Sequence, residues 1–220
     1  MNESLNSECV DGVVYKYGAK WTRKLESKQH WEFYWYQQKL MEGLVGRQDN
    51  EKLLEIGVGS GFTANYCRSK GLDVTTLDID AEKKPDIVAN AVNYVFDKKY
   101  QHLLAFEVFE HMPYLEFEKI VYKIPDFISR YVFLSLPSNK KTAFSLNLKM
   151  PKLKPFIVEW RIPAGKISTE AHHWELDYKE YTTGRVETLF SRAGLRIVKR
   201  ITFQYIKFYA LSVEKGISEN

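Results

Sequence analysis

The sequence predicts an α/β domain with a doubly wound, mostly parallel sheet and antiparallel C-terminal strands. Three observations support this fold class. Short apolar runs alternate with helical patterns between residues 52 and 136, which is typical of parallel β–α–β units. The length of 220 residues suits one domain. Two apolar segments close the sequence with no helix between them, as expected for an antiparallel pair.

The N-terminal region, residues 1–50, is expected to form a helical segment ahead of the sheet. Residues 1–26 are polar with scattered aromatics and show no clear period. In Ser27–Leu44, aromatic and apolar residues recur at three- and four-residue steps, the spacing of one helix face. Gly43 and Gly46 should end this helix.

The alternating series begins with the apolar strand Lys52–Ile56 and the helix Phe62–Lys70, which Gly71 closes as a C-cap. Tyr131–Leu136 ends the series as an unbroken apolar strand of the buried parallel kind. Between them we expect the strands Val74–Leu77, Asp86–Ala89 and His102–Phe106, and the helix Pro113–Ile124.

The link to the third strand of this series is unusually short. Only Ala81–Pro85 separate Asp80 from that strand, whereas a parallel crossover usually needs about a dozen residues or more. Either the crossover helix is missing or the strand at Asp86–Ala89 is misplaced.

Residues 137–176 interrupt the alternation with several prolines and lysines, and are expected to form a substrate-side insertion or lid. The alternation then resumes with a helix at Tyr178–Ala193, capped by Asp177 and closed by Gly194. The last two strands are expected at Leu195–Phe203 and Ile206–Val213.

A glycine-rich turn follows the first strand, in the segment Glu55-Ile56-Gly57-Val58-Gly59-Ser60-Gly61. Gly57 and Gly59 permit a tight turn with no Cβ in the way of a ligand. A dinucleotide fingerprint has its third glycine five residues after the first, where this chain has Phe62. Glu55 would repel a pyrophosphate but would answer a cationic ligand. The turn therefore favours a positively charged, phosphate-free nucleoside.

The order acid-x-Gly-x-Gly-x-Gly after the first strand resembles motif I of class I S-adenosylmethionine-dependent methyltransferases. This resemblance implies a Rossmann-like methyltransferase fold, a single domain over residues 1–220, and S-adenosylmethionine as cofactor. It implies that the turn passes beneath the methionine part of the cofactor, with Glu55, Gly57, Gly59 and Gly61 as binding residues.

The ends of the next two strands fit the same resemblance. Asp78 ends the second strand, and a carboxylate there can accept both ribose hydroxyls. Asp80 is a second candidate, although an N-cap role suits it better. Ile79 would pack against the adenine face. Asn90 follows the third strand, where the family often has Asp, and its side-chain carbonyl would accept a hydrogen bond from the adenine amino group.

The fourth strand leads into Phe106-Glu107-Val108-Phe109-Glu110-His111-Met112. This ending is similar to that of many small-molecule methyltransferases, which implies that Phe106 and Glu107 lie beside the methionine end of the cofactor. The other interpretation of Glu110 and His111 is that they begin a helix and satisfy its free N–H groups.

The short link in "TLDID…KPDIV", the later "SLP" and the "HxWE" pattern together resemble a methyltransferase-like subgroup. The resemblance covers about residues 50–200 and identifies the cofactor better than the acceptor. We therefore expect methyl transfer to an unidentified small molecule, at oxygen or nitrogen.

Three histidines are candidates for a catalytic base, His111, His172 and His173, since histidine titrates near neutral pH. The alternative for His172 is structural packing with Trp174 and Glu175, and Glu175 could instead orient one of the histidines. Two adjacent histidines and a glutamate do not have zinc-ligand spacing, so no metal is predicted.

The insertion carries the lysines Lys140, Lys141, Lys149, Lys152 and Lys154, with Phe144 and Phe156 nearby. They would suit an anionic acceptor, including RNA, or form a solvated surface. RNA methylation is therefore an alternative function. A nucleotide-binding protein of the same fold without catalysis is another, and the missing third dinucleotide glycine argues against an oxidoreductase.

The composition is that of an ordinary globular protein, with 45% hydrophobic and 27% charged residues. A net charge of +4 does not by itself imply a nucleic-acid partner. No apolar stretch approaches the roughly 18 residues of a membrane span, and the polar start is unlike a secretion signal. Two cysteines, Cys9 and Cys67, do not form a disulfide framework. We expect a cytoplasmic protein whose oligomeric state the sequence leaves open.

Overall fold

The computed structural model describes residues 8–10, 13–15, 27–46, 50–148 and 156–214 of the chain. Its centre is a seven-stranded sheet in the order β10-β11-β7-β6-β3-β4-β5. The parallel strands are β3 (Lys52–Ile56), β4 (Asp73–Asp78), β5 (Ile87–Val88), β6 (Tyr100–Phe106) and β7 (Ile128–Pro137). The antiparallel strands are β10 (Leu195–Phe203) and β11 (Ile206–Val213). The predicted fold class is confirmed.

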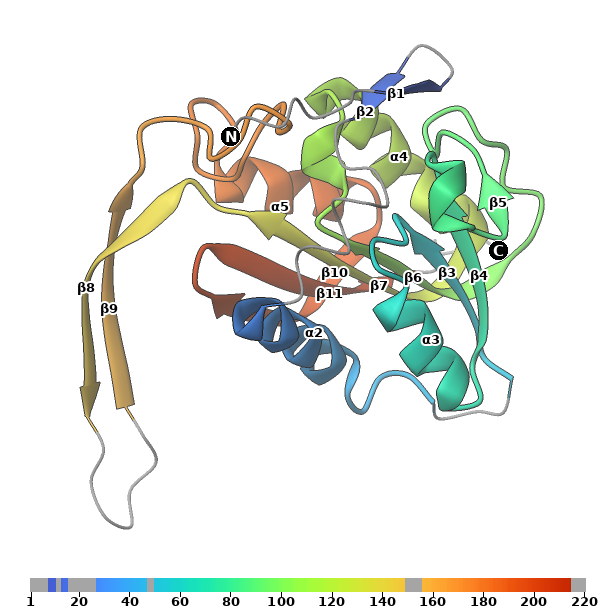
Figure 1. Cartoon of the computed structure of the whole chain (residues 1–220), viewed down its shortest axis with the longest axis horizontal. Coiled ribbons are helices and arrows are strands. Elements are labelled where there is room, and N and C mark those ends of the chain that lie inside the picture. Colours follow the sequence, from blue (N-terminus) through green and yellow to red (C-terminus); the bar gives the residue numbers. More distant parts are fainter. Residues whose placement is uncertain (1–7, 11–12, 16–26, 47–49, 149–155, 215–220) are drawn as a thin grey trace, which may run out of the picture.

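Helices cover both faces of this sheet (Figure 1). One face packs against α2 (Lys28–Met41) and α3 (Phe62–Ser69), and the other against α4 (Tyr114–Phe127) and α5 (Thr183–Arg192). Each face of the sheet has its own apolar core. Successive side chains of a strand point to opposite faces, so Leu53 of β3 packs in the core beneath α2 and α3, and Leu54 packs in the core beneath α4 and α5.

The short link is a single 3₁₀ turn, η2 (Ala81–Lys83), rather than a crossover helix. The Asp80 side chain begins this turn by accepting a hydrogen bond from the Glu82 N–H at 2.8 Å. β5 then pairs with β4 in parallel at the sheet edge. The third strand was therefore placed correctly, although it is shorter than expected, and the crossover helix is absent.

Three helices differ from the sequence prediction by three residues or more at one end. α2 ends at Met41 instead of Leu44. α4 continues past Pro125 to Phe127, and the Phe127 ring stacks on Phe96 with centroids 3.9 Å apart. α5 begins at Thr183 instead of Tyr178, because Thr182 caps it by accepting from the Arg185 N–H at 3.1 Å. Asp177, predicted as the cap, instead accepts from the Thr183 N–H at 3.0 Å.

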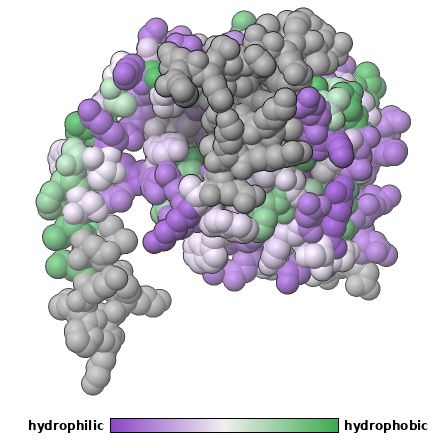
Figure 2. All heavy atoms as spheres, viewed as in Figure 1, coloured by the Kyte–Doolittle hydropathy of each residue, from purple (hydrophilic) through white to green (hydrophobic). Residues whose placement is uncertain are grey.

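The insertion has two parts. The antiparallel strands β8 (Lys140–Leu148) and β9 (Phe156–Pro163) form a hairpin that projects from the body (Figure 1). An apolar stripe of exposed side chains runs along one face of this hairpin and is visible in Figure 2. The described part of the stripe consists of Phe144, Leu146, Leu148, Val158, Trp160 and Ile162. Residues 164–176 return to the body, where Trp174 is fully buried.

Two short strands near the N-terminus, β1 (Glu8–Val10) and β2 (Val13–Tyr15), pair antiparallel. No strand was predicted there, since three-residue strands carry too little pattern to recognise. The predicted helix after them is α2, which Ser27 caps through the His30 N–H. No helix of the described residues is long and apolar enough to cross a membrane.

Candidate functional site

The candidate cofactor residues form a row along one edge of the sheet. In the sheet order β6-β3-β4-β5 all four strands are parallel, so their carboxyl ends share an edge. Glu107, the glycine turn, Asp78 and Asn90 follow these four ends in that order. The chain winds outward in both directions from the β3–β6 boundary, and ligands of open α/β sheets bind at such a switch point.

The glycine turn is held from two sides and open on a third. The Gly57 N–H donates to the Leu77 carbonyl at 2.8 Å, and a Cβ on Gly57 would lie only 2.3 Å from Cγ2 of Val108. At Gly59 φ is +56°, and a Cβ there would meet no atom within 4 Å. Gly61, at φ +78°, is the N-cap of α3. Space for a ligand therefore lies over Gly59.

Asp78 joins the second strand end to this turn. Its Oδ2 accepts from the Val58 N–H at 2.8 Å, and its Oδ1 from the Asp80 N–H at 2.9 Å. The Lys83 ammonium lies 3.3 and 3.2 Å from the two oxygens. A carboxylate has about four acceptor positions, so ribose hydroxyls would occupy those that Lys83 uses here.

Glu55 lies behind the turn rather than in front of it. Its side chain is buried, and burial raises the pKa of this carboxyl to about 8, against the opposing charge of Arg68. The carboxyl accepts a hydrogen bond from the Ala64 backbone in α3. A neutral, buried carboxyl supports the turn, and its predicted attraction to a cationic ligand stays a prediction.

The adenine side of the row contains Asn90 and Ile79. Asn90 is buried and its Oδ1 accepts from the Val92 N–H at 3.0 Å, closing a local turn. That oxygen has a second lone pair for another donor. Ile79 is half-buried at the end of β4. Both residues lie where the sequence reasoning placed them, and their contacts with adenine stay a prediction.

Glu107 ends the row at β6, just after the half-buried Phe106, with φ at +53°. Ser135 of β7 fixes it from both sides. The Ser135 hydroxyl accepts from the Glu107 N–H at 3.0 Å and donates to Glu107 Oε1 at 2.7 Å. Burial raises the pKa of the Glu107 carboxyl to about 7, and the charge of Glu175 adds to the rise. The sequence analysis singled out Ser135 only as part of the "SLP" pattern and assigned it no contact with Glu107.

Two of the three candidate histidines lie together. The ring centroids of His111, in η3 (Phe109–His111), and of His172 are 5.0 Å apart. The buried Glu110 carboxylate lies beside both rings. Burial lowers the pKa of His111 to about 4, with a further contribution from His172. His173 is exposed and outside this cluster.

Glu175 orients His172. Its carboxylate is 1% exposed, and Oε1 lies 2.8 Å from Nδ1 of His172. The same carboxylate accepts from Asn139 Nδ2 at 2.6 Å and from the Ser168 N–H at 2.8 Å. Although burial would raise its pKa, the bonds from His172, Ser168 and Asn139 lower it to about 2. The predicted orienting role is the one this geometry supports.

The neighbouring tryptophan is a core residue. Trp174 is fully buried, its Nε1 donates to the Phe109 carbonyl at 3.1 Å, and it packs edge-on against Tyr114 at 5.0 Å. Asn139 and Lys83 were not identified from the sequence. No motif marks Asn139, and Lys83 reaches Asp78 only because the link is one short turn.

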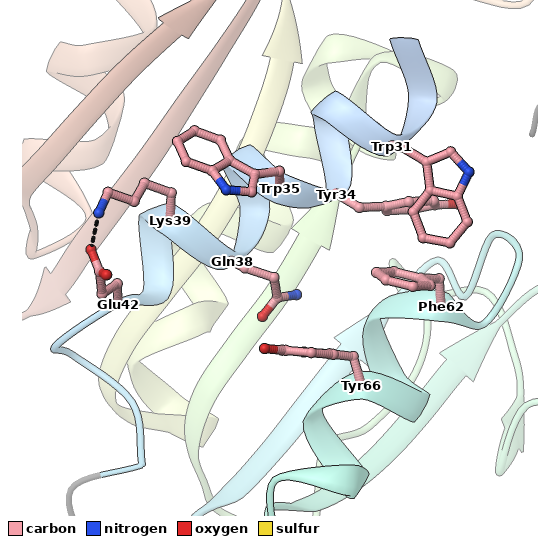
Figure 3. A pocket seen from close by; sticks show the side chains of 8 residues that line it. All are labelled: Trp31, Tyr34, Trp35, Gln38, Lys39, Glu42, Phe62 and Tyr66. Atoms are coloured by element: carbon pink, nitrogen blue, oxygen red, sulfur yellow. Dashed lines mark hydrogen bonds and ion pairs between the residues drawn. The ribbon is translucent and has the colours of Figure 1, made fainter. Parts of the chain in front are cut away.

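A groove of about 590 Å³ lies between α2 and α3, beside the glycine turn (Figure 3). Tyr34 joins it to the turn, because its hydroxyl lies 2.6 Å from Oγ of Ser60 and its ring stacks on Phe62 at 4.3 Å. None of the sequence-predicted site residues lines this groove, whose lining is Trp31, Tyr34, Trp35, Gln38, Lys39, Glu42, Phe62 and Tyr66.

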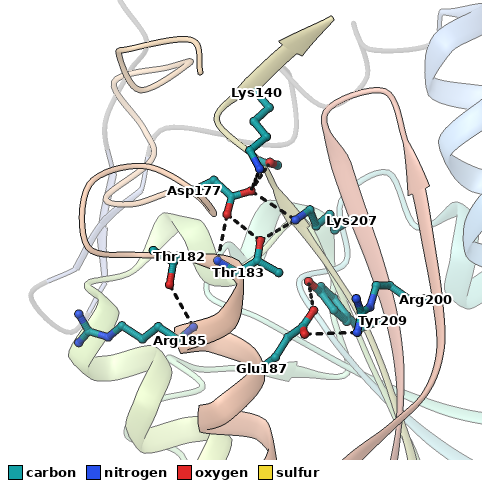
Figure 4. Close-up of polar contacts among 10 residues, drawn as sticks. Lys140, Asp177, Thr182, Thr183, Arg185, Glu187, Arg200, Lys207 and Tyr209 are labelled. Atoms are coloured by element: carbon teal, nitrogen blue, oxygen red, sulfur yellow. Dashed lines mark hydrogen bonds and ion pairs between the residues drawn. The ribbon is translucent and has the colours of Figure 1, made fainter. Parts of the chain in front are cut away.

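The root of the hairpin is fixed to the body by Asp177 (Figure 4). Its Oδ2 pairs with Lys140 of β8 at 3.1 Å and with Lys207 of β11 at 3.3 Å, while Oδ1 accepts from the Thr183 hydroxyl at 2.8 Å. Lys140 is therefore neutralised locally and Lys141 is exposed. Lys149, Lys152 and Lys154 lie outside the described residues.

Comparison with known proteins agrees with this geometry. A family model described as a methyltransferase domain matches residues 29–199. A search of curated proteins found no match. Among solved structures, the chain is similar to the N-methyltransferase NodS from Bradyrhizobium japonicum in complex with S-adenosylhomocysteine. Their identity is 8%, the TM-score is 0.59, and 88% of this chain and 91% of that chain are covered.

Two further solved structures show the same fold. One is a 1,6-didemethyltoxoflavin-N1-methyltransferase from Burkholderia thailandensis with its namesake compound and S-adenosylhomocysteine bound. It has 12% identity and a TM-score of 0.55, covering 88% of this chain and 87% of that one. The other is the small RNA methyltransferase HEN1, with 11% identity and a TM-score of 0.56, covering 86% of this chain and 25% of that one.

Proposed function

The chain belongs to the methyltransferase domain family, and on this premise we propose that it is an enzyme that transfers the methyl group of S-adenosylmethionine to a small molecule at oxygen or nitrogen. The observation that carries the proposal is the row of side chains and backbone at the carboxyl edge of four parallel strands. The row is open over Gly59, where a Cβ would meet nothing within 4 Å.

The residues present fit this cofactor. Asp78 is a buried carboxylate with room for hydroxyl donors once Lys83 moves, which suits a ribose. Asn90 retains one lone pair for an adenine amino group. The turn presents backbone and no phosphate-binding cation, which suits a phosphate-free nucleoside. Glu107, fixed by Ser135 at the other end of the row, would lie at the methionine end.

S-adenosylmethionine supplies a methyl group on a sulfonium, an excellent leaving group. The protein therefore has to position the acceptor in line, exclude water and, for a protonated acceptor, remove a proton. His111 and His172 lie beyond the Glu107 end of the row and are the residues we propose for the acceptor side. His173 is the weaker candidate because its side chain is exposed.

Calorimetry with S-adenosylhomocysteine tests the cofactor proposal directly. We expect one saturable site and a rise in melting temperature, since a ligand that binds only the folded state stabilises it. Turnover with labelled cofactor over a panel of hydroxyl and amine acceptors tests the transfer. Absence of both heat and thermal shift at millimolar ligand would contradict the proposal. Binding without any turnover would favour the non-catalytic alternative.

RNA is the second candidate acceptor. The observation that favours it is the projecting hairpin, whose exposed Phe144 and Trp160 lie opposite one another near the exposed Lys141. Aromatic and basic side chains together bind single-stranded nucleic acid. RNA binding that weakens steeply between 50 and 200 mM salt, as expected for about six phosphate contacts, would favour this alternative. Binding that is absent at low salt would exclude it.

A further inference from the structure

Three side chains with metal-binding atoms converge at the Glu107 end of the sheet. The carboxylate of Glu110 and ring nitrogens of His111 and His172 all lie within 4.8 Å of one another. The first two come from η3, directly after β6, and the third from the segment that returns from the hairpin. Glu110 and His111 are neighbours in the sequence, and the tertiary structure brings His172 to them.

Glu110 is the unusual member of this cluster. Its side chain is 0% exposed, and neither carboxylate oxygen has a hydrogen-bond partner on another described residue. Two further carboxylates, Glu107 and Glu175, are close enough to act on it electrostatically. A charged carboxylate that is buried without a donor costs several kcal/mol unless a proton or a cation neutralises it. The position therefore suits a cation.

The histidines are held as metal-binding histidines usually are. Nδ1 of His172 lies 2.8 Å from Oε1 of Glu175, and Nδ1 of His111 lies 3.2 Å from the Ala171 carbonyl. Hydrogen bonds from Nδ1 to a carboxylate and to a carbonyl fix the ring orientation and favour the tautomer whose lone pair is on Nε2. Glu175 is in turn fixed by Asn139 and Ser168.

We propose that Glu110, His111 and His172 form a binding site for a divalent first-row transition cation. Two imidazoles and one carboxylate suit Zn²⁺, Mn²⁺ or Fe²⁺ better than the all-oxygen sites of Ca²⁺. Ligand atoms of a tetrahedral zinc ion are about 3.4 Å apart, so side-chain shifts of roughly an ångström complete the site. The sequence prediction of no metal considered only His172, His173 and Glu175, and did not weigh Glu110 and His111 of η3 as ligands.

The role of this cation site rests on the proposed methyl transfer, and it narrows the class of acceptor. Three protein ligands leave at least one position of a tetrahedral ion for water or an acceptor oxygen. A bound cation lowers the pKa of such an oxygen, so its proton leaves to solvent before the oxygen attacks. The O–CH₃ bond then forms as the S–CH₃ bond breaks, with its electron pair going to sulfur. The expected acceptor class is a hydroxyl compound.

Calorimetric titration of the tag-free, chelator-treated full chain with Zn²⁺ and with Mn²⁺ tests the site. We expect about one ion per chain in the wild type. Glu110→Gln keeps the shape of the buried side chain, and we expect at least a tenfold loss of affinity from removing its charge. His172→Asn should lose affinity by a similar factor. His173→Asn is the matched control, because it removes an exposed neighbouring histidine and should bind as the wild type does.

Thermal melting provides a second measurement that is independent of turnover. Zn²⁺ should raise the melting temperature of the wild type and of His173→Asn, and should leave that of Glu110→Gln unchanged. Metal-free Glu110→Gln should melt close to the metal-free wild type, since the amide has the shape of the carboxyl and carries no charge into the buried site. This comparison also shows that the variant is folded.

Two results would overturn the site. One is no saturable binding by the wild type at millimolar Zn²⁺ or Mn²⁺. The other is equal affinity in wild type, Glu110→Gln and His172→Asn, which would place the ion elsewhere on the surface. S-adenosylhomocysteine binding measured in chelator separates the two proposals. Cofactor binding without metal binding removes the site alone, and metal binding without cofactor binding removes the proposed function alone.

Discussion

The Oδ2 atom of Asp78 accepts a hydrogen bond of 2.8 Å from the Val58 backbone N–H. This contact links the end of β4 to the glycine turn that follows β3, in the adjacent strand of the sheet. The residue proposed to hold the ribose therefore also holds the shape of the turn proposed to lie beneath the methionine. Changes at Asp78 should affect cofactor binding through both effects.

Replacing Asp78 with Asn should weaken S-adenosylhomocysteine binding by roughly 10- to 100-fold, because a charged acceptor is lost and an amide faces N–H donors. Calorimetry measures the affinity. Asp73→Asn makes the same chemical change at the exposed start of the same strand, so its affinity should equal that of the wild type. Equal affinity in Asp78→Asn would remove Asp78 from the binding site.

Gly57 and Gly59, the first two glycines of the turn, should respond differently to replacement by alanine. At Gly57 the added Cβ would lie 2.3 Å from Cγ2 of Val108, at φ +80°, so we expect a loss of about 2 kcal/mol or more in the free energy of unfolding. At Gly59 the Cβ meets open space at φ +56°. Gly59→Ala should lose only about 1 kcal/mol but should bind S-adenosylhomocysteine at least tenfold more weakly. Denaturant unfolding and calorimetry measure the two effects.

A double variant tests the reason given for Gly57. If Val108 is the obstacle, Gly57→Ala should cost less in a Val108→Ala background than in the wild type. The cost at Gly59 should be the same in both backgrounds. Additive effects at Gly57 and Val108 would contradict the steric explanation and leave the positive φ as the sole cause.

The sequence predicted the parts of the molecule that depend on local patterns. The strand Lys52–Ile56 and both C-terminal strands have the observed bounds, because apolar runs between turn residues define them. The short link at Ala81–Pro85 left two interpretations, and only the parallel pairing of β5 with β4 decided between them. The predicted start of α5 was wrong because Thr182 and Asp177 are both favourable N-cap residues, and the sequence alone does not show which of them caps the helix.

The candidate site was predictable in part for a similar reason. The row from Glu107 to Asn90 follows strand ends, which the alternating pattern locates. The cluster at Glu110 depends on residues 164–176 folding back beside η3, where the His173 N–H donates to the Glu110 carbonyl at 2.8 Å. No local pattern encodes this contact, so the sequence placed Glu110 only in the motif after the fourth strand or at the start of a helix.

The hairpin should be dispensable for folding and cofactor binding. β8 and β9 pair with each other, and their described apolar stripe is exposed. Replacing residues 142–161 with a two-residue Asn-Gly turn should shift the melting temperature by no more than about 3 °C. It should leave S-adenosylhomocysteine affinity unchanged. If the insertion acts on the acceptor, turnover should fall in the same variant. A loss of cofactor binding in the folded variant would instead place the hairpin over the cofactor.

The stability of the chain should fall in mild acid because of a buried histidine. His102 is 0% exposed, and its Nε2 lies 3.1 Å from Oε2 of Glu51. Burial lowers the pKa of His102 to about 4, against the opposing effect of Glu51. The folded chain therefore keeps the imidazole neutral where the unfolded chain, with a pKa near 6.5, binds a proton. This contribution is complete above pH 6.5 and is lost as the pH falls toward 4.

Glu51 acts in the same direction at lower pH. Burial alone would raise its pKa, but the Gly46 N–H, His102 and Arg130 together hold it below its usual value. A carboxyl with a lowered folded pKa stabilises the fold above its unfolded pKa, and that stabilisation is lost as the pH falls through the folded value. Burial also lowers the pKa of His111 to about 4, so both histidines contribute between pH 6.5 and 5, and only the difference between the wild type and a His102 variant isolates His102.

We expect the wild type to lose roughly 2 kcal/mol of unfolding free energy between pH 6.5 and 5 through His102. His102→Gln retains a donor toward Glu51 but does not titrate, so it should lose correspondingly less over that interval. His173→Gln removes an exposed histidine and should follow the wild type. Urea unfolding at closely spaced pH values gives the three curves. Parallel curves for wild type and His102→Gln would show that His102 is protonated in the folded chain as readily as in the unfolded one.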